Sequence, residues 1–87
     1  QESLDMVLKK HEFWKIHEHT ELNERQRKML NKLLEHFDGK LTSSKWAKIT
    51  KCSTDTALRD IKDLMDKGIL RQEHGGGRST NYERVPF

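Results

Sequence analysis

The fold of this chain is decided by residues 42–68, which read TSSKWAKITKCSTDTALRDIKDLMDKG. A capping residue at Thr42 or Ser43 predicts a short helix that ends near Thr50. Its apolar side chains, which we expect to be buried, are Trp46, Ala47 and Ile49. Lys51-Cys52 then forms a tight turn before a second capped helix. Two helices joined by so short a turn predict a helix-turn-helix motif.

The second helix of the motif carries a start signal and a stop signal. Ser53 is its expected N-cap, the helix runs to Lys67, and Gly68 stands where a helix-ending glycine belongs. The stripe expected to face the core consists of Ala57, Leu58, Ile61, Leu64 and Met65. The expected outward face consists of Asp55, Thr56, Arg59, Asp60, Asp63 and Asp66, with Lys62 at its margin. This helix is therefore predicted to be amphipathic, with several acidic residues on its open side.

Another helix is expected before the motif. Asn23, with Gln26 three residues later, predicts a capping box that begins a helix running to about Phe37. The side chains that this helix should bury are Leu30, Leu33, Leu34 and Phe37, with Met29 at the edge. Gly39 can take the positive φ that ends a helix.

The pattern changes from helical to extended after Gly68. Residues 69–73 and 79–84 are predicted strands, and the glycine-rich segment 74–78 joins them as a flexible hairpin loop. Lys40-Leu41 can form a further brief strand. The order of elements predicts a mainly α chain with a small β-hairpin, a winged helix-turn-helix, and the hairpin argues against a plain three-helix bundle.

The domain itself is assigned to residues 22–87, and residues 1–21 are assigned to a linking helix from about Ser3 to His17. The stripe expected to pack on the domain consists of Leu4, Val7, Leu8 and Trp14. Met6 and Phe13 lie on roughly the opposite side of this helix. They are the predicted interface residues for an intermolecular contact, in the simplest case a homodimer.

Composition narrows the class of protein further. Of the 87 residues 32% are hydrophobic and 36% are charged, and no apolar run is long enough to span a membrane. With a single cysteine and no signal-peptide pattern, we expect a cytoplasmic protein. Residues 1–22 hold three Lys and five acidic residues, whereas residues 23–87 hold fourteen Lys or Arg and nine acidic residues. The second part is thus the basic one, which suits an anionic partner such as nucleic acid.

Four stretches resemble the C-terminal winged-helix domain of bacterial Fic-family proteins: residues 22–30, 39–48, 52–61 and 75–82. The most specific pieces are Thr56-Ala57-Leu58-Arg59-Asp60 and Gly75-Gly76-Gly77-Arg78-Ser79. The resemblance implies a module that follows a Fic catalytic domain, a protein AMP-transferase, in the parent chain. Residues 1–21 would then be the helix leaving that domain. The histidine-proline motif of Fic catalysis is missing here, so the chain is expected to lack enzymatic activity of its own.

For duplex DNA, the expected contacts come from the second motif helix, the basic residues near the turn, and the loop of the hairpin. The candidate nucleic-acid-binding residues are Lys45, Lys48, Lys51, Thr54, Thr56, Arg59 and Arg78. The three lysines lie three apart and can form one basic strip, although they can equally be a solvated face. The glycines before Arg78 can likewise be only a loose turn.

The alternative function is a protein-interaction or regulatory module of the parent enzyme, including dimerisation. The aspartates of the second motif helix favour it, and the lysines and Arg78 favour nucleic acid. No cofactor or metal is expected. His17 and His19 would point to different sides of a helix, and no known ligand spacing occurs.

Overall fold

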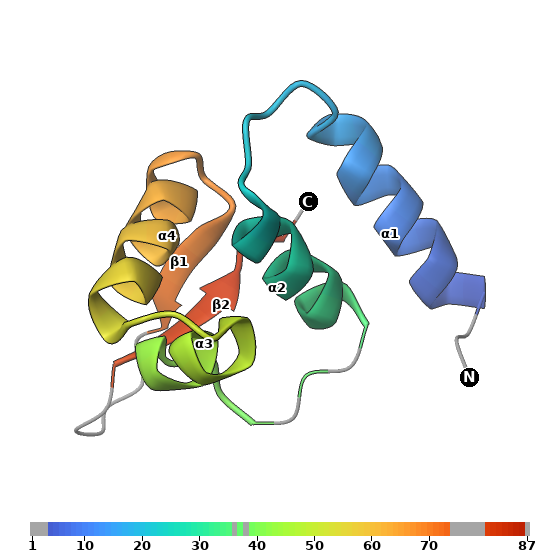
Figure 1. Cartoon of the computed structure of the whole chain (residues 1–87). Helices are drawn as coiled ribbons and strands as arrows, with labels where there is room; N and C mark the ends of the chain where they lie inside the picture. The colour runs from blue at the N-terminus through green and yellow to red at the C-terminus, as the bar shows by residue number, and fades with distance from the viewer. Residues whose placement is uncertain (1–3, 36, 38, 74–79, 87) are drawn as a thin grey trace. The chain divides into compact units, whose positions relative to one another are not determined.

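The computed structural model describes residues 4–35, 37, 39–73 and 80–86 (Figure 1). The chain divides into two compact units, residues 1–37 and residues 38–86. The first holds helices α1 (Leu4–Ile16) and α2 (Glu24–Leu34). The second holds helices α3 (Ser43–Thr50) and α4 (Thr54–Asp66), followed by strands β1 (Leu70–Glu73) and β2 (Asn81–Arg84). The expected order of elements, mainly helical with one hairpin, is confirmed.

The predicted capping box begins α2. The side chain of Asn23 accepts a hydrogen bond from the amide of Gln26 at 2.8 Å, and the amide of Asn23 donates to the side chain of Gln26 at 2.9 Å. The helix ends at Leu34, three residues before the expected end at Phe37. Glu35 leaves helical geometry with φ −94° and ψ −106°. Its amide is shared between the carbonyls of Asn31 and Lys32, a tightened last turn.

Helix α1 lies beside α2 and packs on it (Figure 1). The side chains that pack are only in part the expected ones. The indole of Trp14 donates to the Asn31 side chain at 2.8 Å, and the Lys10 ammonium pairs with Glu35 at 2.7 Å. Phe13, a predicted interface residue, is only 1% exposed, and its ring meets Trp14 edge-on at 5.0 Å between ring centroids. Met6 is half-buried.

Three of the four residues in the stripe that was expected to pack are exposed instead, and the fourth, Trp14, is half-buried. Leu4 is 75% exposed, Val7 45% and Leu8 54%. The expectation that Met6 and Phe13 form the bare side was wrong for this chain. Phe13 from the side expected to be bare, Trp14 from the expected stripe and one ion pair are the groups that pack, and they outweigh the three aliphatic side chains.

In the second unit, both motif helices begin at predicted caps. The Thr42 hydroxyl accepts from the amide of Lys45 at 3.1 Å, and the Ser53 hydroxyl accepts from the amide of Thr56 at 3.1 Å. At the end of α4, Gly68 takes φ +75°, which a residue with a side chain adopts only with strain.

The two strands form an antiparallel pair in which Leu70 lies opposite Arg84 and Glu73 lies opposite Asn81. In place of the brief strand considered for Lys40-Leu41, Leu41 forms a single β-bridge to Tyr82, whose amide donates to the Leu41 carbonyl at 2.9 Å. The amide of Ile69 donates to the carbonyl of Leu64 at 2.9 Å. The hairpin is thus attached directly to the end of α4.

The buried residues agree in part with the predicted core. Six of the predicted side chains are buried, namely Leu30, Leu34, Trp46, Ala57, Ile61 and Leu64, and Met29, placed at the edge, is buried as well. Six are half-buried instead, namely Leu33, Phe37, Ala47, Ile49, Leu58 and Met65. Three apolar residues outside the predicted core, Leu41, Ile69 and Leu70, are each 2% exposed. None of the described helices is long and apolar enough to cross a membrane.

Candidate nucleic-acid interface

The turn between α3 and α4 has a fixed and unusual backbone. Lys51 ends α3 with φ 58° and ψ 48°, the left-handed conformation, and it is the one non-glycine with positive φ among the described residues. The amide of Cys52 donates to the carbonyl of Ala47 at 3.0 Å. Thr50 donates its hydroxyl proton to the carbonyl of Trp46 at 2.8 Å. These bonds let α4 begin at Thr54, directly after its cap.

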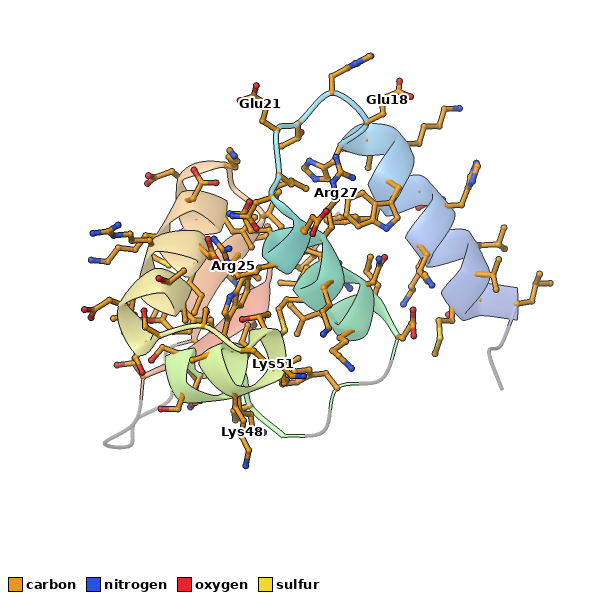
Figure 2. The ribbon with its side chains drawn as sticks, viewed as in Figure 1. Glu18, Glu21, Arg25, Arg27, Lys48 and Lys51 are labelled. Carbon is orange, nitrogen blue, oxygen red and sulfur yellow. The ribbon has the colours of Figure 1, made fainter. Side chains whose placement is uncertain are left out.

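The three predicted lysines do not form one uniform strip. Lys48 and Lys51 are exposed, and Figure 2 shows Lys48 projecting away from the ribbon of α3. Lys45 is half-buried, and its ammonium lies 2.7 Å from the point where a Cβ on Gly39 would stand. Lys45 therefore folds back over the segment before α3. The structure leaves two of the three cations fully open at the turn.

Helix α4 turns a narrow polar stripe outward. Its exposed members are Asp55, Arg59, Lys62 and Asp66, which follow one another at steps of four, three and four residues. The buried residues of α4 lie on the opposite face of the helix and are Ala57, Asp60, Ile61 and Leu64. This spacing keeps four side chains on one face of a helix, the geometry needed to enter a groove.

The acidic character of this face is smaller than the sequence indicated. Asp60 was expected to point outward, but it is 5% exposed and accepts a hydrogen bond from the indole of Trp46 at 3.3 Å. Asp63 pairs with Lys67 at 2.7 Å. Within the described part of the chain, Asp55 and Asp66 are the carboxylates of α4 that stay open and unpaired. The main argument against an anionic partner is thereby weakened.

The predicted threonines differ in their surroundings. Thr54 is exposed in the first turn of α4. Thr56 is half-buried, and its hydroxyl accepts a hydrogen bond from the Ser53 hydroxyl at 3.0 Å. Thr56 is therefore part of the helix cap, and Thr54 is the more accessible of the two.

The hairpin neutralises most of its own described charges. Arg71 pairs across the strands with Glu83 at 2.6 Å, and Lys40 pairs with Glu73. The hydrogen bond to the Glu73 carboxylate raises the pKa of Lys40. Arg78, the predicted wing contact, and the glycines before it lie outside the described residues.

Sequence reasoning undervalued one cation and misplaced one acid. Lys62, placed at the margin, lies in the middle of the exposed stripe three residues after Arg59. That spacing was a readable signal. The burial of Asp60 had no such signal, since it depends on Trp46 of another helix. No group of three potential metal-binding side chains occurs among the residues that the structure describes.

A solved structure, Lactococcus lactis ZitR in complex with DNA, is similar in fold with a TM-score of 0.64 at 15% sequence identity, covering 98% of this chain and 67% of that one. No curated protein sequence matches the chain. Neither finding concerns a Fic-family protein, so the Fic parent stays a prediction. The family model of the DeoR-like helix-turn-helix domain matches residues 25–83. The chain therefore belongs to the family of DeoR-like helix-turn-helix domains.

Proposed function

We propose that this chain is a DNA-binding module in which α4 enters the major groove of duplex DNA. The observation that carries the proposal is the exposed stripe of α4 next to the open lysines of the turn. A helix that buries one face completely and leaves the other polar and exposed can be inserted into a groove without losing its core contacts. The structural neighbour ZitR was solved in complex with DNA, which supports the same use of a similar fold.

The expected contacts divide by chemistry. Lys48 and Lys51 would hold backbone phosphates beside the groove, because they are exposed cations shortly before the start of α4. Thr54 and Arg59 would reach base edges from the outward face. Lys45 and Thr56 would contribute less, since both are half-buried. Arg78 is proposed to reach the minor groove from the loop of the hairpin.

The experiment is a titration of the whole chain with a fluorescent duplex of mixed sequence at several salt concentrations. We expect weak binding whose logarithm falls linearly with the logarithm of salt, because each neutralised phosphate releases counterions. Lys48→Ala and Lys51→Ala should each reduce the magnitude of that slope by about 0.9. Lys15→Ala is the matched control, an exposed lysine on α1 whose loss should leave the slope unchanged.

Two results would count against the proposal. The first is an absence of binding even at low salt. The second is an equal effect of Lys15→Ala and Lys48→Ala, because binding would then depend on overall charge rather than on the motif. Either result leaves the family assignment intact, since a helix-turn-helix fold also serves protein contacts.

A second candidate function, self-association, is favoured by the exposed stripe on α1. Leu4, Val7 and Leu8 form one apolar row at helical spacing, and each is at least 45% exposed. One such row is enough for a two-fold dimer, because the same patch serves both copies. Sedimentation should then give a dimer for the unmodified chain and for Lys15→Glu, but a monomer for Leu8→Glu. A monomeric unmodified chain at high concentration would contradict this function.

A further inference from the structure

Two oppositely charged side chains on the outward face of α4 stand four residues apart without pairing. Asp55 and Arg59 are both exposed, and neither side chain has a hydrogen-bond or ion-pair partner within the described residues. An acidic residue four positions before a basic one on a helix is a favourable arrangement for an ion pair. Here the carboxylate and the guanidinium each remain available to a partner outside the chain.

We propose that Asp55 and Arg59 determine the DNA sequence preference of this module, by selecting a cytosine and a guanine one or two base pairs apart. This inference rests on the proposed DNA binding and specifies its target. The residues are about 6 Å apart along the helix axis, while stacked base pairs are about 3.4 Å apart. They can therefore reach different base pairs of one short site from the same helix face.

The chemistry of the major-groove edge makes Asp55 selective. A carboxylate only accepts hydrogen bonds, and cytosine offers the N4 amino group as a donor with no acceptor on the same base edge. Guanine presents two acceptors and thymine presents the O4 acceptor, so both repel a carboxylate. Adenine has a donor, but its N7 acceptor lies beside it. Cytosine is accordingly the base that fits Asp55.

Arg59 has the opposite requirement. Its guanidinium only donates, and it can bond to O6 and N7 of guanine at the same time. The amino group of cytosine offers it no acceptor. A base that suits Asp55 thus rejects Arg59, and the reverse holds as well. The two side chains are therefore expected to read different bases.

Asp55 should also weaken binding to DNA of the wrong sequence. Its charge has the same sign as the phosphates, and only a bond to a suitable base offsets the repulsion and the loss of water. Removal of this carboxylate is therefore expected to have two opposite effects. Affinity for non-matching DNA rises, and discrimination between sequences falls.

To test the inference, duplexes that bind the unmodified chain are selected from a randomised library, and the bound DNA is sequenced. We expect an enriched site that holds a cytosine and a guanine one or two base pairs apart. Asp55→Ala should lose the cytosine preference, by about 5- to 100-fold in relative affinity, and keep the guanine. Asp55→Asn should shift the preferred base from cytosine to adenine, because an amide bonds to both N6 and N7 of adenine.

Asp66→Ala is the matched control, because it removes the same charge from the same exposed stripe eleven residues further on. It should leave the enriched site unchanged. Circular dichroism of each variant confirms that α4 is still folded. If the chain binds DNA in a salt-dependent way, but Asp55→Ala selects the same DNA site as the unmodified chain, this inference alone is overturned. Failure of the unmodified chain to bind any duplex overturns both this inference and the proposed function.

Discussion

The indole nitrogen of Trp46 in α3 donates a hydrogen bond to the carboxylate of Asp60 in α4 at 3.3 Å. Trp46 is fully buried and Asp60 is 5% exposed. A buried charged group is costly unless it is hydrogen-bonded, so the bond links the two helices of the motif in one arrangement. Together with the buried side chains of Ala57, Ile61 and Leu64, it holds α4 in the rotation that leaves Asp55, Arg59, Lys62 and Asp66 exposed.

Asp60→Ala should destabilise the chain by about 1–3 kcal/mol, because it leaves the buried indole N–H of Trp46 without this acceptor. Urea unfolding followed by circular dichroism measures the change in the free energy of unfolding. Asp66→Ala is the control, since Asp66 is exposed on the same helix and a surface change of this kind stays within about 0.5 kcal/mol. Equal stabilities of the two variants would mean that the Trp46 bond has no energetic role.

The rotation of α4 about its own axis can be tested with two aliphatic side chains. Ile61 is completely buried, whereas Leu58 is half-buried. Ile61→Ala should cost about 2–5 kcal/mol, because it leaves a cavity in the core. Leu58→Ala should cost clearly less, since water already reaches that position. Urea unfolding of both variants decides the matter, and a larger loss for Leu58→Ala would show that the helix is rotated from the described position.

The sequence was sufficient to predict the parts of the fold that depend on neighbouring residues. The caps at Asn23, Thr42 and Ser53 rest on bonds to amides three residues later, so their signals are local. Gly68 was likewise readable as a helix end. The helix-turn-helix follows from these signals and from the two-residue turn, and the hairpin follows from the change of pattern after Gly68.

What the sequence did not reveal depends on contacts between distant residues. The apolar pattern placed Leu58 in the core and Asp60 outside it, but the bond from Trp46 buries Asp60. On α1, counting apolar residues favoured the stripe of Leu4, Val7, Leu8 and Trp14, but of these only Trp14 packs, together with Phe13 from the other side. The pattern of polar and apolar residues in a sequence does not show which distant side chain will hydrogen-bond to a buried polar group.

Acidification should weaken the fold through His17. The ring of His17 lies 4.6 Å from the ring of Phe13, and burial lowers the pKa of His17 below its usual 6.5. The folded state therefore disfavours the charged ring, and its contribution to stability is complete above about pH 6.5 and is lost as the pH falls below that value. Urea unfolding between pH 7.5 and pH 5 should show this loss.

His17→Gln is the control for that measurement, because it keeps a polar side chain and removes the titration. The difference in unfolding free energy between the two proteins cancels the effect of the other four histidines. That difference should fall as the pH is lowered. A constant difference across the range would rule out His17 as the source of the acid sensitivity.

Lys51 offers a test that separates the effect of a substitution on stability from its effect on binding. Its left-handed backbone costs a residue with a side chain about 1–2 kcal/mol, whereas glycine adopts it freely. Lys51→Ala and Lys51→Gly both remove the ammonium group, but only the glycine relieves the strain. We therefore expect Lys51→Gly to be more stable than Lys51→Ala by up to about 1 kcal/mol, after the greater flexibility of unfolded glycine is included.

Both variants should bind duplex DNA with the same reduced salt dependence, because both lack the phosphate contact. Lys51→Arg should keep the salt dependence of the unmodified chain. Urea unfolding and the duplex titration, carried out on the same preparations, separate the two effects. If Lys51→Gly is the less stable variant, the turn does not store backbone strain. If it binds DNA as tightly as the unmodified chain, the strained position is not maintained for a phosphate contact.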